Sequence, residues 1–296
     1  MNLERIIVGI QGLGLAETAY QNSLAYANDR KQGKANNNND NNTDLIIKHA
    51  DIRRSLLNMK SIIEGQRSLA FWLSQQIDVS LNHDNENVRK EANEMVSLMT
   101  PVIKSFFSDM GMEITNEAIQ IFGGYGYTRD QGIEQLFRDN RITPIYEGTN
   151  SVQAIDLVFR KVLSNKILDK FITEVKSEIK KTNGSEDLKK FSSILENKIV
   201  ILESFAKWLE KRFKEQKDDV SASCNDFLKT LGYIALGYSW LKMSKISILN
   251  ADKNKDFYEE KINTAKYFFD KITPRIDSHY HSAISGSDSI MKAKFN

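Results

Sequence analysis

The hydrophobic pattern is helical along most of the chain. From residue 1 to about 29, apolar residues recur every three or four positions, which predicts an amphipathic helix. The same spacing predicts a second helix from Asp44 to Gln76 or beyond, and a third that begins near Glu86 and continues to Phe122. Pro101 lies inside the third pattern. Because proline lacks a backbone N–H donor, we expect it to kink this helix or to open its second half.

Three glycines interrupt the first helical pattern. Gly9, Gly12 and Gly14 each cost about 1 kcal/mol of helix propensity relative to alanine. Their presence predicts close approach of the backbone to a neighbouring helix or to a ligand. Their spacing is not that of a dinucleotide-binding fingerprint, and no strand precedes them. Residues 34–43 are rich in asparagine and low in complexity, which predicts a surface loop between the first two helices.

The segment after the third helix is more irregular. The pattern predicts a short helix over Gln131–Arg138, an extended stretch over Ile142–Ile145, and a last helix that opens at Thr149 or Asn150. Asn150 and Gln153 have the spacing of a capping box, in which two side chains satisfy free N–H groups at a helix start.

The composition changes after residue 165, where lysine and glutamate become frequent and the glycine motifs vanish. Further helical patterns cover residues 166–182, 186–215, 221–248 and 254–272. The sequence therefore predicts an all-α protein with two domains. Residues 1–165 would form a four-helix up-and-down bundle, and residues 166–296 a second helical bundle.

Composition excludes several classes of function. The net charge of +2 gives no reason to expect a nucleic acid or an anionic membrane as the main partner. No run of about 18 apolar residues is present, so no membrane span is expected. Glu4 and Arg5 stand where a signal peptide would need an apolar core. A cytoplasmic location is therefore expected.

Cysteine and histidine usage predicts neither a disulfide nor a metal site. Cys224 is the single cysteine, so it cannot form an intramolecular disulfide, and no histidine lies near it in the sequence. We interpret it as a small packing residue. The pair His279 and His281 is too isolated to indicate a zinc site.

The segment Ile145–Asn150 is the strongest candidate for chemistry. It places the carboxylate of Glu147 between an apolar pair and a Gly-Thr turn that opens a helix. Ile145 and Tyr146 would partly desolvate this carboxylate, which suits a general base. The alternative is a surface glutamate before a helix start, where negative charge is favoured by the helix dipole.

A second candidate segment ends the third helix. Residues 120–128 run from a helix end into a loop rich in glycine and tyrosine. Gly123 and Gly124 predict a left-handed C-cap. Because glycine has no side chain, a dinucleotide can also lie against this backbone.

Together, residues 120–128 and 145–150 resemble the C-terminal half of the acyl-CoA dehydrogenase flavoprotein family, and the resemblance covers roughly residues 1–163. The remainder resembles the extra helical domain of a longer subgroup that includes the methylthiopropanoyl-CoA dehydrogenases. The resemblance implies FAD as cofactor, an acyl-CoA thioester as substrate, α,β-dehydrogenation as the reaction, an electron-transfer flavoprotein as partner, and a homo-oligomer with shared sites.

The resemblance also implies roles for single residues near the C-terminal candidate segment. Glu147 matches the base that removes the α-proton, and Gly148 matches the residue beside which the thioester passes. The turn formed by Thr149, Asn150 and Ser151 would contact FAD; N-capping is the other interpretation.

Other matching residues lie further upstream. Gln120, Ile121, Phe122, Gly123 and Gly124 would contact the flavin nucleotide of a neighbouring subunit. Arg30 would reach the pyrophosphate, as a charge-assisted contact favours arginine. Many relatives carry an aromatic residue shortly after this arginine, whereas this chain has Gln32-Gly33. Arg5 would lie beside the substrate, with Glu4 on the same helix as a reserve candidate for the base. Arg138, Asp139 and Arg141 are expected to form a local ion network before Glu147.

Whole members of the family carry an N-terminal helical domain and a central β-domain before the part that resembles this chain. The expectation is therefore a partial enzyme, which would be a truncated product, one half of a split enzyme, or a retained assembly module without catalysis. An acyl-CoA oxidase is the rival within the same enzyme class, because it differs in how the reduced flavin reacts with oxygen.

Overall fold

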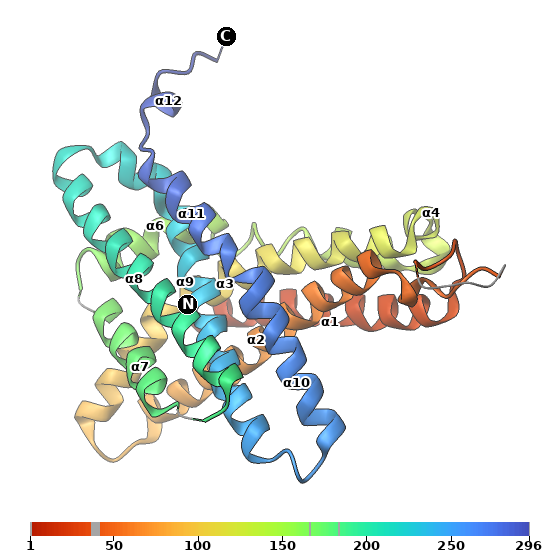
Figure 1. The fold of residues 1–296 in the computed structure, drawn as a ribbon. Helices are drawn as coiled ribbons and strands as arrows, with labels where there is room; N and C mark the ends of the chain where they lie inside the picture. The colour runs from red at the N-terminus through yellow and green to blue at the C-terminus, as the bar shows by residue number, and fades with distance from the viewer. Residues whose placement is uncertain (1, 37–41, 166, 183, 296) are drawn as a thin grey trace.

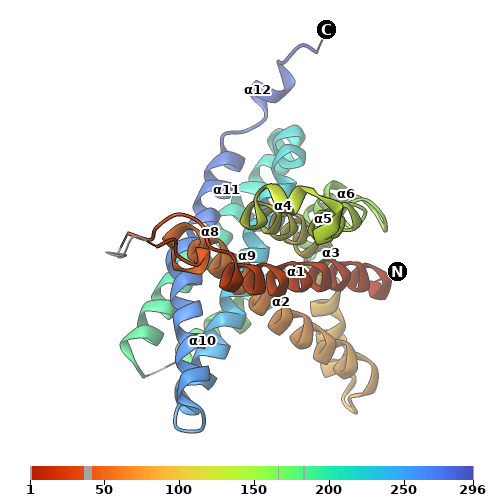
Figure 2. The same ribbon diagram turned by 90° about the vertical axis from the view of Figure 1, so that its right-hand side faces the viewer.

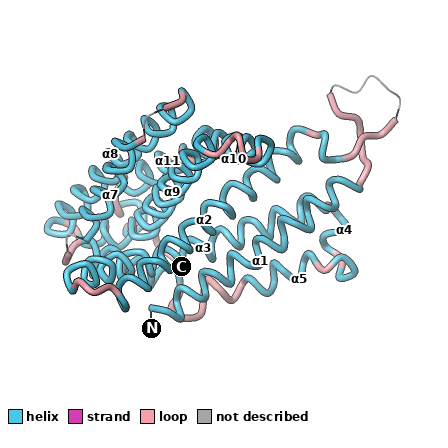
Figure 3. Tube along the Cα trace, turned by 90° about the horizontal axis from the view of Figure 1, so that it is seen from below, coloured by secondary structure: helices cyan, strands magenta, loops and turns pink. Residues whose placement is uncertain are grey.

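The computed structural model describes residues 2–36, 42–165, 167–182 and 184–295, and within these ranges the chain consists of helices and turns with one isolated β-bridge (Figures 1 and 3). The α-helices are α1 (Asn2–Asp29), α2 (Ala50–Asn82), α3 (Glu86–Phe122), α4 (Gly124–Tyr127), α5 (Ile133–Asn140), α6 (Asn150–Ile155), α7 (Ile167–Lys181), α8 (Glu186–Glu215), α9 (Lys217–Leu249), α10 (Lys255–Tyr267), α11 (Pro274–Ile284) and α12 (Asp288–Met291). Short 3-10 helices cover Ile46–Lys48 and Arg129–Gln131, and π-helical turns cover Asp156–Val162 and Phe268–Ile272. The predicted all-α class is confirmed.

Helices α1, α2 and α3 lie side by side (Figure 3), and α1 packs most closely on α3. A Cβ atom at Gly9 would lie 2.5 Å from the carbonyl oxygen of Ile103, so a side chain there would push the two helices apart. The predicted close approach at this glycine is confirmed. Gly14 has open space around it and needs no such explanation.

The loop between α1 and α2 determines where α2 begins. Helix α2 begins at Ala50 rather than Asp44, because residues 44–46 pair through their backbone with residues 30–33, which follow α1. The N–H of Asp44 donates to the carbonyl of Gly33 at 2.9 Å, and the N–H of Gln32 donates to the carbonyl of Asp44 at 2.9 Å. Of the predicted asparagine-rich loop, residues 37–41 lie outside the described residues.

Helix α3 runs without interruption through Pro101, so the expectation that its second half would open is wrong. The Asn85 side chain caps its start by accepting from the N–H groups of Asn87 and Val88. At its end, Gly123 has a positive φ of 61°, as the C-cap prediction requires, but its ψ of −139° lies outside the left-handed helical region.

The stretch before Glu147 is not extended, contrary to prediction. Consecutive tight turns follow α5: Thr143 N–H donates to the Asn140 carbonyl at 3.0 Å, and Ile145 N–H donates to the Ile142 carbonyl at 2.9 Å. Local hydrogen bonds of this kind outweigh the strand preference of the isoleucines, which have no partner strand here. Helix α5 itself begins two residues later than predicted.

Helix α9 joins the second half of the chain to the first. It contacts α8, α10 and α11 on one side and α2, α3 and α6 on the other (Figures 1 and 2). The Trp240 indole N–H donates to the Ser61 carbonyl at 2.9 Å, and Arg275 of α11 pairs with Glu113 of α3 at 2.7 Å. Buried residues of both halves therefore form one continuous core. The domain division at residues 165/166 stays a prediction.

The described residues include no helix that is both long and apolar enough to cross a lipid bilayer.

Candidate functional site

The turn that carries Glu147 has an unusual backbone. Glu147 has a φ of 56°, and it is the only non-glycine residue with a positive φ in the described part of the chain. Such a conformation costs on the order of 1–3 kcal/mol and persists only when the surroundings enforce it. Gln153 enforces it by donating from Nε2 to the Glu147 carbonyl at 3.0 Å, and the Asn150 N–H donates to the Pro144 carbonyl at 3.0 Å.

Asn150, the first residue of α6, fastens this turn to α3. Its Oδ1 atom accepts from Lys104 Nζ at 2.9 Å, and its Nδ2 atom donates to Asp109 Oδ1 at 2.6 Å and to the Ser105 carbonyl at 3.2 Å. Ser108 Oγ lies 3.0 Å from Asn150 Nδ2 and accepts from it. The capping-box prediction is therefore wrong: both side chains are engaged elsewhere, and Thr149 occupies the N-cap position without a side-chain hydrogen bond.

Lys104 and Asp109 are site residues that the hydrophobic pattern did not single out. The Lys104 side chain is fully buried, and this burial lowers its pKa to about 8, while Asp109 and Glu147 act to raise that pKa. Burial raises the pKa of Asp109. The charge of Lys229 and the hydrogen bond from Asn150 act to lower this pKa and partly offset the effect of burial. The available signal was the presence of two charged residues within a stretch of α3 whose other residues are apolar or small and polar.

Glu147 lies at the surface of this chain. Its side chain is exposed, and Ile145 is 44% exposed, so the expected desolvation by these neighbours is not provided within the chain. Tyr146 instead donates its hydroxyl to Gln11 of α1. Thr149 and Ser151 are exposed beside Glu147.

Gly148 is required by the same turn. Its φ is 88°, and a Cβ atom there would lie 2.7 Å from Gln153 Nε2. A side chain at this position would thus collide with the amide that holds the Glu147 carbonyl. The structure gives Gly148 a local role in addition to the one that the sequence suggested.

Arg5 of α1 lies near the same turn. Its guanidinium is 3.9 Å from Asp156 Oδ2, and its buried Nε makes no hydrogen bond within the described residues. The charges of both Arg5 and Glu147 act on Lys104, which places all three in one region. Glu4 is exposed on the first turn of α1.

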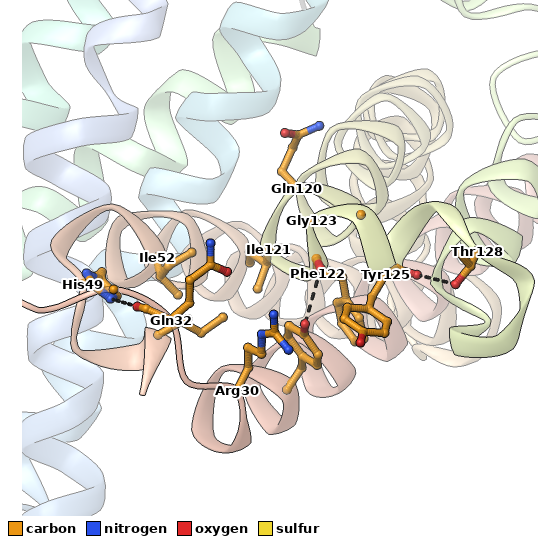
Figure 4. Close-up of a pocket in the computed structure, with 14 residues that line it drawn as sticks. Arg30, Gln32, His49, Ile52, Gln120, Ile121, Phe122, Gly123, Tyr125 and Thr128 are labelled. Atoms are coloured by element: carbon orange, nitrogen blue, oxygen red, sulfur yellow. Dashed lines mark hydrogen bonds between the residues drawn. The ribbon is translucent and has the colours of Figure 1, made fainter. Parts of the chain in front are cut away.

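The second group of predicted residues lines a pocket of about 770 Å³ (Figure 4). The pocket is lined by Tyr26, Arg30, Gln32, Gly33, Ile46, His49, Ile52, Gln120, Ile121, Phe122, Gly123, Gly124, Tyr125 and Thr128. The structure thus brings Arg30 together with all five predicted residues of 120–124. Figure 4 shows the Gln120 side chain directed away from Arg30.

Aromatic side chains shape this pocket. Tyr26 stacks on Phe122 with ring centres 4.1 Å apart, and the Arg30 guanidinium lies 5.3 Å from the centre of the Tyr125 ring. His49 Nε2 lies 2.8 Å from the Gln32 carbonyl, so it carries the proton because a carbonyl only accepts. Tyr26 and His49 were not predicted as site residues.

The two groups of site residues lie toward opposite ends of α1. Arg5 and Arg30 are 25 residues apart in the sequence, which corresponds to about 37 Å along a helix. Figure 3 shows the N-terminus at one end of α1 and α4 at the other. Thr149, Asn150 and Ser151 therefore belong with Glu147, and not with the pocket.

The remaining candidates have structural explanations. Cys224 is buried and free, and burial raises its pKa to about 12, which agrees with a packing role. Arg138 forms its ion pair with Glu134 at 2.6 Å on its own helix, and the charge of Asp139 also acts on Arg138. The predicted network that includes Arg141 stays a prediction. In the parts of the chain described, no group of three or more histidine, cysteine or acidic side chains could hold a metal ion.

Residues 1–162 match the family model described as "Acyl-CoA dehydrogenase, C-terminal domain", and residues 171–294 match "Acetyl-CoA dehydrogenase C-terminal like". The chain is 31% identical over 304 residues to 3-methylmercaptopropionyl-CoA dehydrogenase of Ruegeria pomeroyi, which covers 99% of this chain and 50% of the relative. It is 30% identical over 307 residues to a butyryl-CoA dehydrogenase of Syntrophomonas wolfei, and this match covers 99% of this chain and 48% of the relative. The chain thus spans about half the length of these curated relatives.

Among solved structures, the fold is similar to an acyl-CoA dehydrogenase from Bacillus anthracis complexed with FAD. The TM-score is 0.74 at 21% identity, and the match covers 98% of this chain and 50% of the other. At this identity the likeness concerns the fold alone.

Proposed function

Because this chain belongs to the acyl-CoA dehydrogenase family, we propose that it takes part in the FAD-dependent α,β-dehydrogenation of an acyl-CoA thioester, with Glu147 as the base. The observation that carries the proposal is the backbone of Glu147. Its positive φ is enforced by hydrogen bonds from Gln153 and Asn150, and strain of this kind concentrates at functional sites.

The proposed step divides two hydrogens between two acceptors. A Glu147 oxygen takes the α-proton, which the neighbouring thioester carbonyl makes acidic. Bound FAD would supply the acceptor for the β-hydrogen, which leaves as hydride with its electron pair. Gly148 leaves the thioester room to approach the backbone, and Gln153 keeps the turn from shifting as the proton moves.

The residues of the Arg30 pocket suit the nucleotide part of FAD. Gly123 and Gly124 have open space where a side chain would stand, so a ligand can reach their backbone. Arg30 offers a guanidinium for phosphate, and the volume of about 770 Å³ is typical of cofactor pockets.

The distance between the two groups of residues supports a shared arrangement. About 37 Å along α1 is more than an extended flavin dinucleotide spans. One chain would therefore contact two different FAD molecules, with its Glu147 turn and with its Arg30 pocket. This arrangement requires a homo-oligomer in which neighbouring chains complete each other's sites.

The exposure of Glu147 requires a further polypeptide. General-base catalysis on an acyl chain works best where water is excluded, and this chain leaves the Glu147 side chain exposed. We propose that an N-terminal and a β-domain cover this turn, in the same longer protein or in a separate chain. Electrons would pass to an electron-transfer flavoprotein, and a cytoplasmic location suits the reduced Cys224.

The test is Glu147→Gln in the assembly with these domains. The variant should keep its yellow flavin but lose flavin reduction by acyl-CoA by about 10²- to 10⁴-fold, because the amide cannot accept the proton. Bleaching of the oxidised flavin band under anaerobic conditions measures this. Glu134→Gln on α5 is the matched control and should reduce flavin normally. Unimpaired reduction in Glu147→Gln would move the base elsewhere, with Glu4 as the next candidate.

The exposed Glu147 also favours one competing function, a helical assembly module without catalysis. That function predicts no flavin on the assembled protein, so an absorbance scan separates the two. If flavin is present and reduced, oxygen uptake during turnover separates an oxidase from a dehydrogenase.

A further inference from the structure

A buried cation lies directly under the Glu147 turn. Lys104 is fully buried in α3, and its ammonium donates to Asn150 Oδ1 at 2.9 Å. Asn150 opens α6 and stands three residues after Glu147. The lysine therefore contacts the segment that determines where Glu147 lies, and not Glu147 itself.

Packing alone does not explain a lysine at this position. Its neighbours along α3 are buried residues that carry no charge, both apolar and small polar: Thr100, Val102, Ile103, Ser105, Phe106, Phe107 and Ser108. An apolar side chain would fill the same space without the desolvation cost of a buried charge. The interactions that this charge makes with its partners must therefore offset that cost.

The charge gives the Asn150 amide one orientation. Lys104 can only donate and ionised Asp109 can only accept, so the amide oxygen must face the lysine and the amide nitrogen must face the aspartate. Asp109 and the Ser105 carbonyl hold the nitrogen side of this amide. Lys104, together with the Ser108 hydroxyl at 3.3 Å, supplies the donors that hold its oxygen side.

We propose that Lys104 is a positioning residue for the Glu147 turn. It holds this turn on α3 through Asn150, and so fixes the direction in which the Glu147 side chain points. Its relevance to catalysis rests on the function proposed above. The hold itself does not, because it is a property of the chain without cofactor or substrate.

The charged groups around Lys104 come from several elements. Asp109 lies on its own helix, Arg5 on α1, and Glu147 on the turn. Lys229 of α9 and Arg141 act on Asp109 in turn. Any measurement of Lys104 ionisation therefore reports on this whole group.

The first test uses amide hydrogen exchange in the full chain. In Lys104→Met, whose unbranched side chain is uncharged and one atom shorter, the amides of residues 145–150 should exchange at least tenfold faster than the change in the free energy of unfolding accounts for. Lys104→Arg, which keeps the charge, should restore slow exchange.

The matched control is Lys161→Met, because Lys161 also bonds to α3, donating to Ser97 Oγ at 2.8 Å. Ser97 lies about two helical turns before Lys104 on α3. This variant should leave exchange at 145–150 unchanged. Unchanged exchange in Lys104→Met, or equal acceleration in Lys161→Met, overturns the proposal.

A second measurement leaves Lys104 in place, so it remains decisive if Lys104→Met does not fold. Chemical shifts of labelled lysine should give Lys104 a titration midpoint of about 8 in the native chain. Glu147→Gln should lower this midpoint, because the Glu147 carboxylate favours the charged lysine, and Glu134→Gln should not. A midpoint that Glu147→Gln leaves unchanged overturns the placement of Lys104 beneath the turn.

The failure of one proposal is distinguishable from failure of the other. Exchange and lysine titration need neither flavin nor turnover, so normal flavin reduction in Glu147→Gln would reject Glu147 as base and leave the hold by Lys104 standing. In an active assembly, Lys104→Met should lower kcat with little change in KM, since it disturbs the position of the base and not the binding of the acyl-CoA.

Discussion

At the scale of single residues, the Glu147 turn combines a strained backbone with supports from three directions. Gln153 bonds its carbonyl, Asn150 fastens the next helix to α3, and Tyr146 bonds to Gln11 of α1. Each support uses a side chain that a surface loop would leave in solvent. The buried Lys104 also supports the turn, through its bond to Asn150. Its ionisation should make the free energy of unfolding of the whole chain depend on pH.

We predict that Lys104 makes stability depend on pH in the alkaline range. Burial lowers its pKa to about 8 in the folded chain, below the ordinary 10.5 that applies when unfolded. Between these two values the unfolded chain binds more protons, so this contribution to stability rises with pH, by up to about 3 kcal/mol in total. Below about pH 8 the cost of the buried charge is present in full.

Urea unfolding of the native chain and Lys104→Met across this range measures the effect. The variant lacks the titrating group, so any advantage it has at neutral pH should shrink as the pH rises from about 8 to 10.5. Other groups cancel in the comparison. A difference between the two proteins that stays constant with pH would contradict the predicted ionisation.

At the scale of elements, helix ends carried most of the sequence information. Gly123-Gly124 ends a long periodic pattern and could be predicted as a helix end, while Arg30 was predicted through the family resemblance. The pocket forms where the ends of these two helices meet. His49 and Tyr26 could not be predicted, because their places depend on backbone pairing within the α1–α2 loop and on stacking between helices. Periodicity describes the face of a helix and contains no information on such contacts.

The same limit applies to the region of Glu147. Its sequence motif predicted that Glu147 stands before a helix start, and the fold has α6 begin three residues later, at Asn150. Its role as base stays a prediction. Lys104, however, lies in the buried stretch of α3, where its position relative to Asn150, 46 residues away, depends on how α6 packs. The capping-box spacing misled because the Asn150 side chain bonds to α3 and the Gln153 side chain bonds to the Glu147 carbonyl in the preceding turn.

For the pocket element, we predict that Arg30 dominates nucleotide binding. Arg30→Ala should weaken binding of ADP, the nucleotide portion of FAD, by about tenfold or more, because a hydrogen bond to a charged group contributes about 1.5–3 kcal/mol. Arg30→Lys should recover part of this loss, since it keeps the charge without the planar fork. Calorimetric titration of the full chain gives the affinities.

Arg67→Ala is the matched control, because Arg67 is an arginine of α2 that pairs with Glu17 outside the pocket. It should bind ADP like the native chain. Equal affinity in Arg30→Ala would mean that the pocket does not bind nucleotide phosphate through this residue.

At the scale of the whole molecule, the two segments that match separate family models share one core. Helix α9 fits against α3 so closely that a Cβ atom at Gly232 would lie 2.6 Å from the Phe106 ring. Trp240 and Arg275 also form hydrogen bonds across the boundary between the two halves. The apolar core of each half is therefore completed by residues of the other half. The site at Glu147 therefore depends on the second half through α3, which carries Lys104.

This continuity predicts a single cooperative unfolding transition that a change at the boundary shifts as a whole. Gly232→Ala should lower stability by about 1–3 kcal/mol, because the added methyl forces Phe106 or α9 to move. Gly14→Ala, in α1 with open space around it, should instead leave stability equal or raise it by up to about 1 kcal/mol. Circular dichroism gives the midpoints, and hydrogen exchange in α1 and α9 shows whether both helices respond together. The contradicting outcome is two separate transitions, with Gly232→Ala shifting only the transition that includes α9. The halves would then fold independently, and the support of the Glu147 turn would lie within the first half alone.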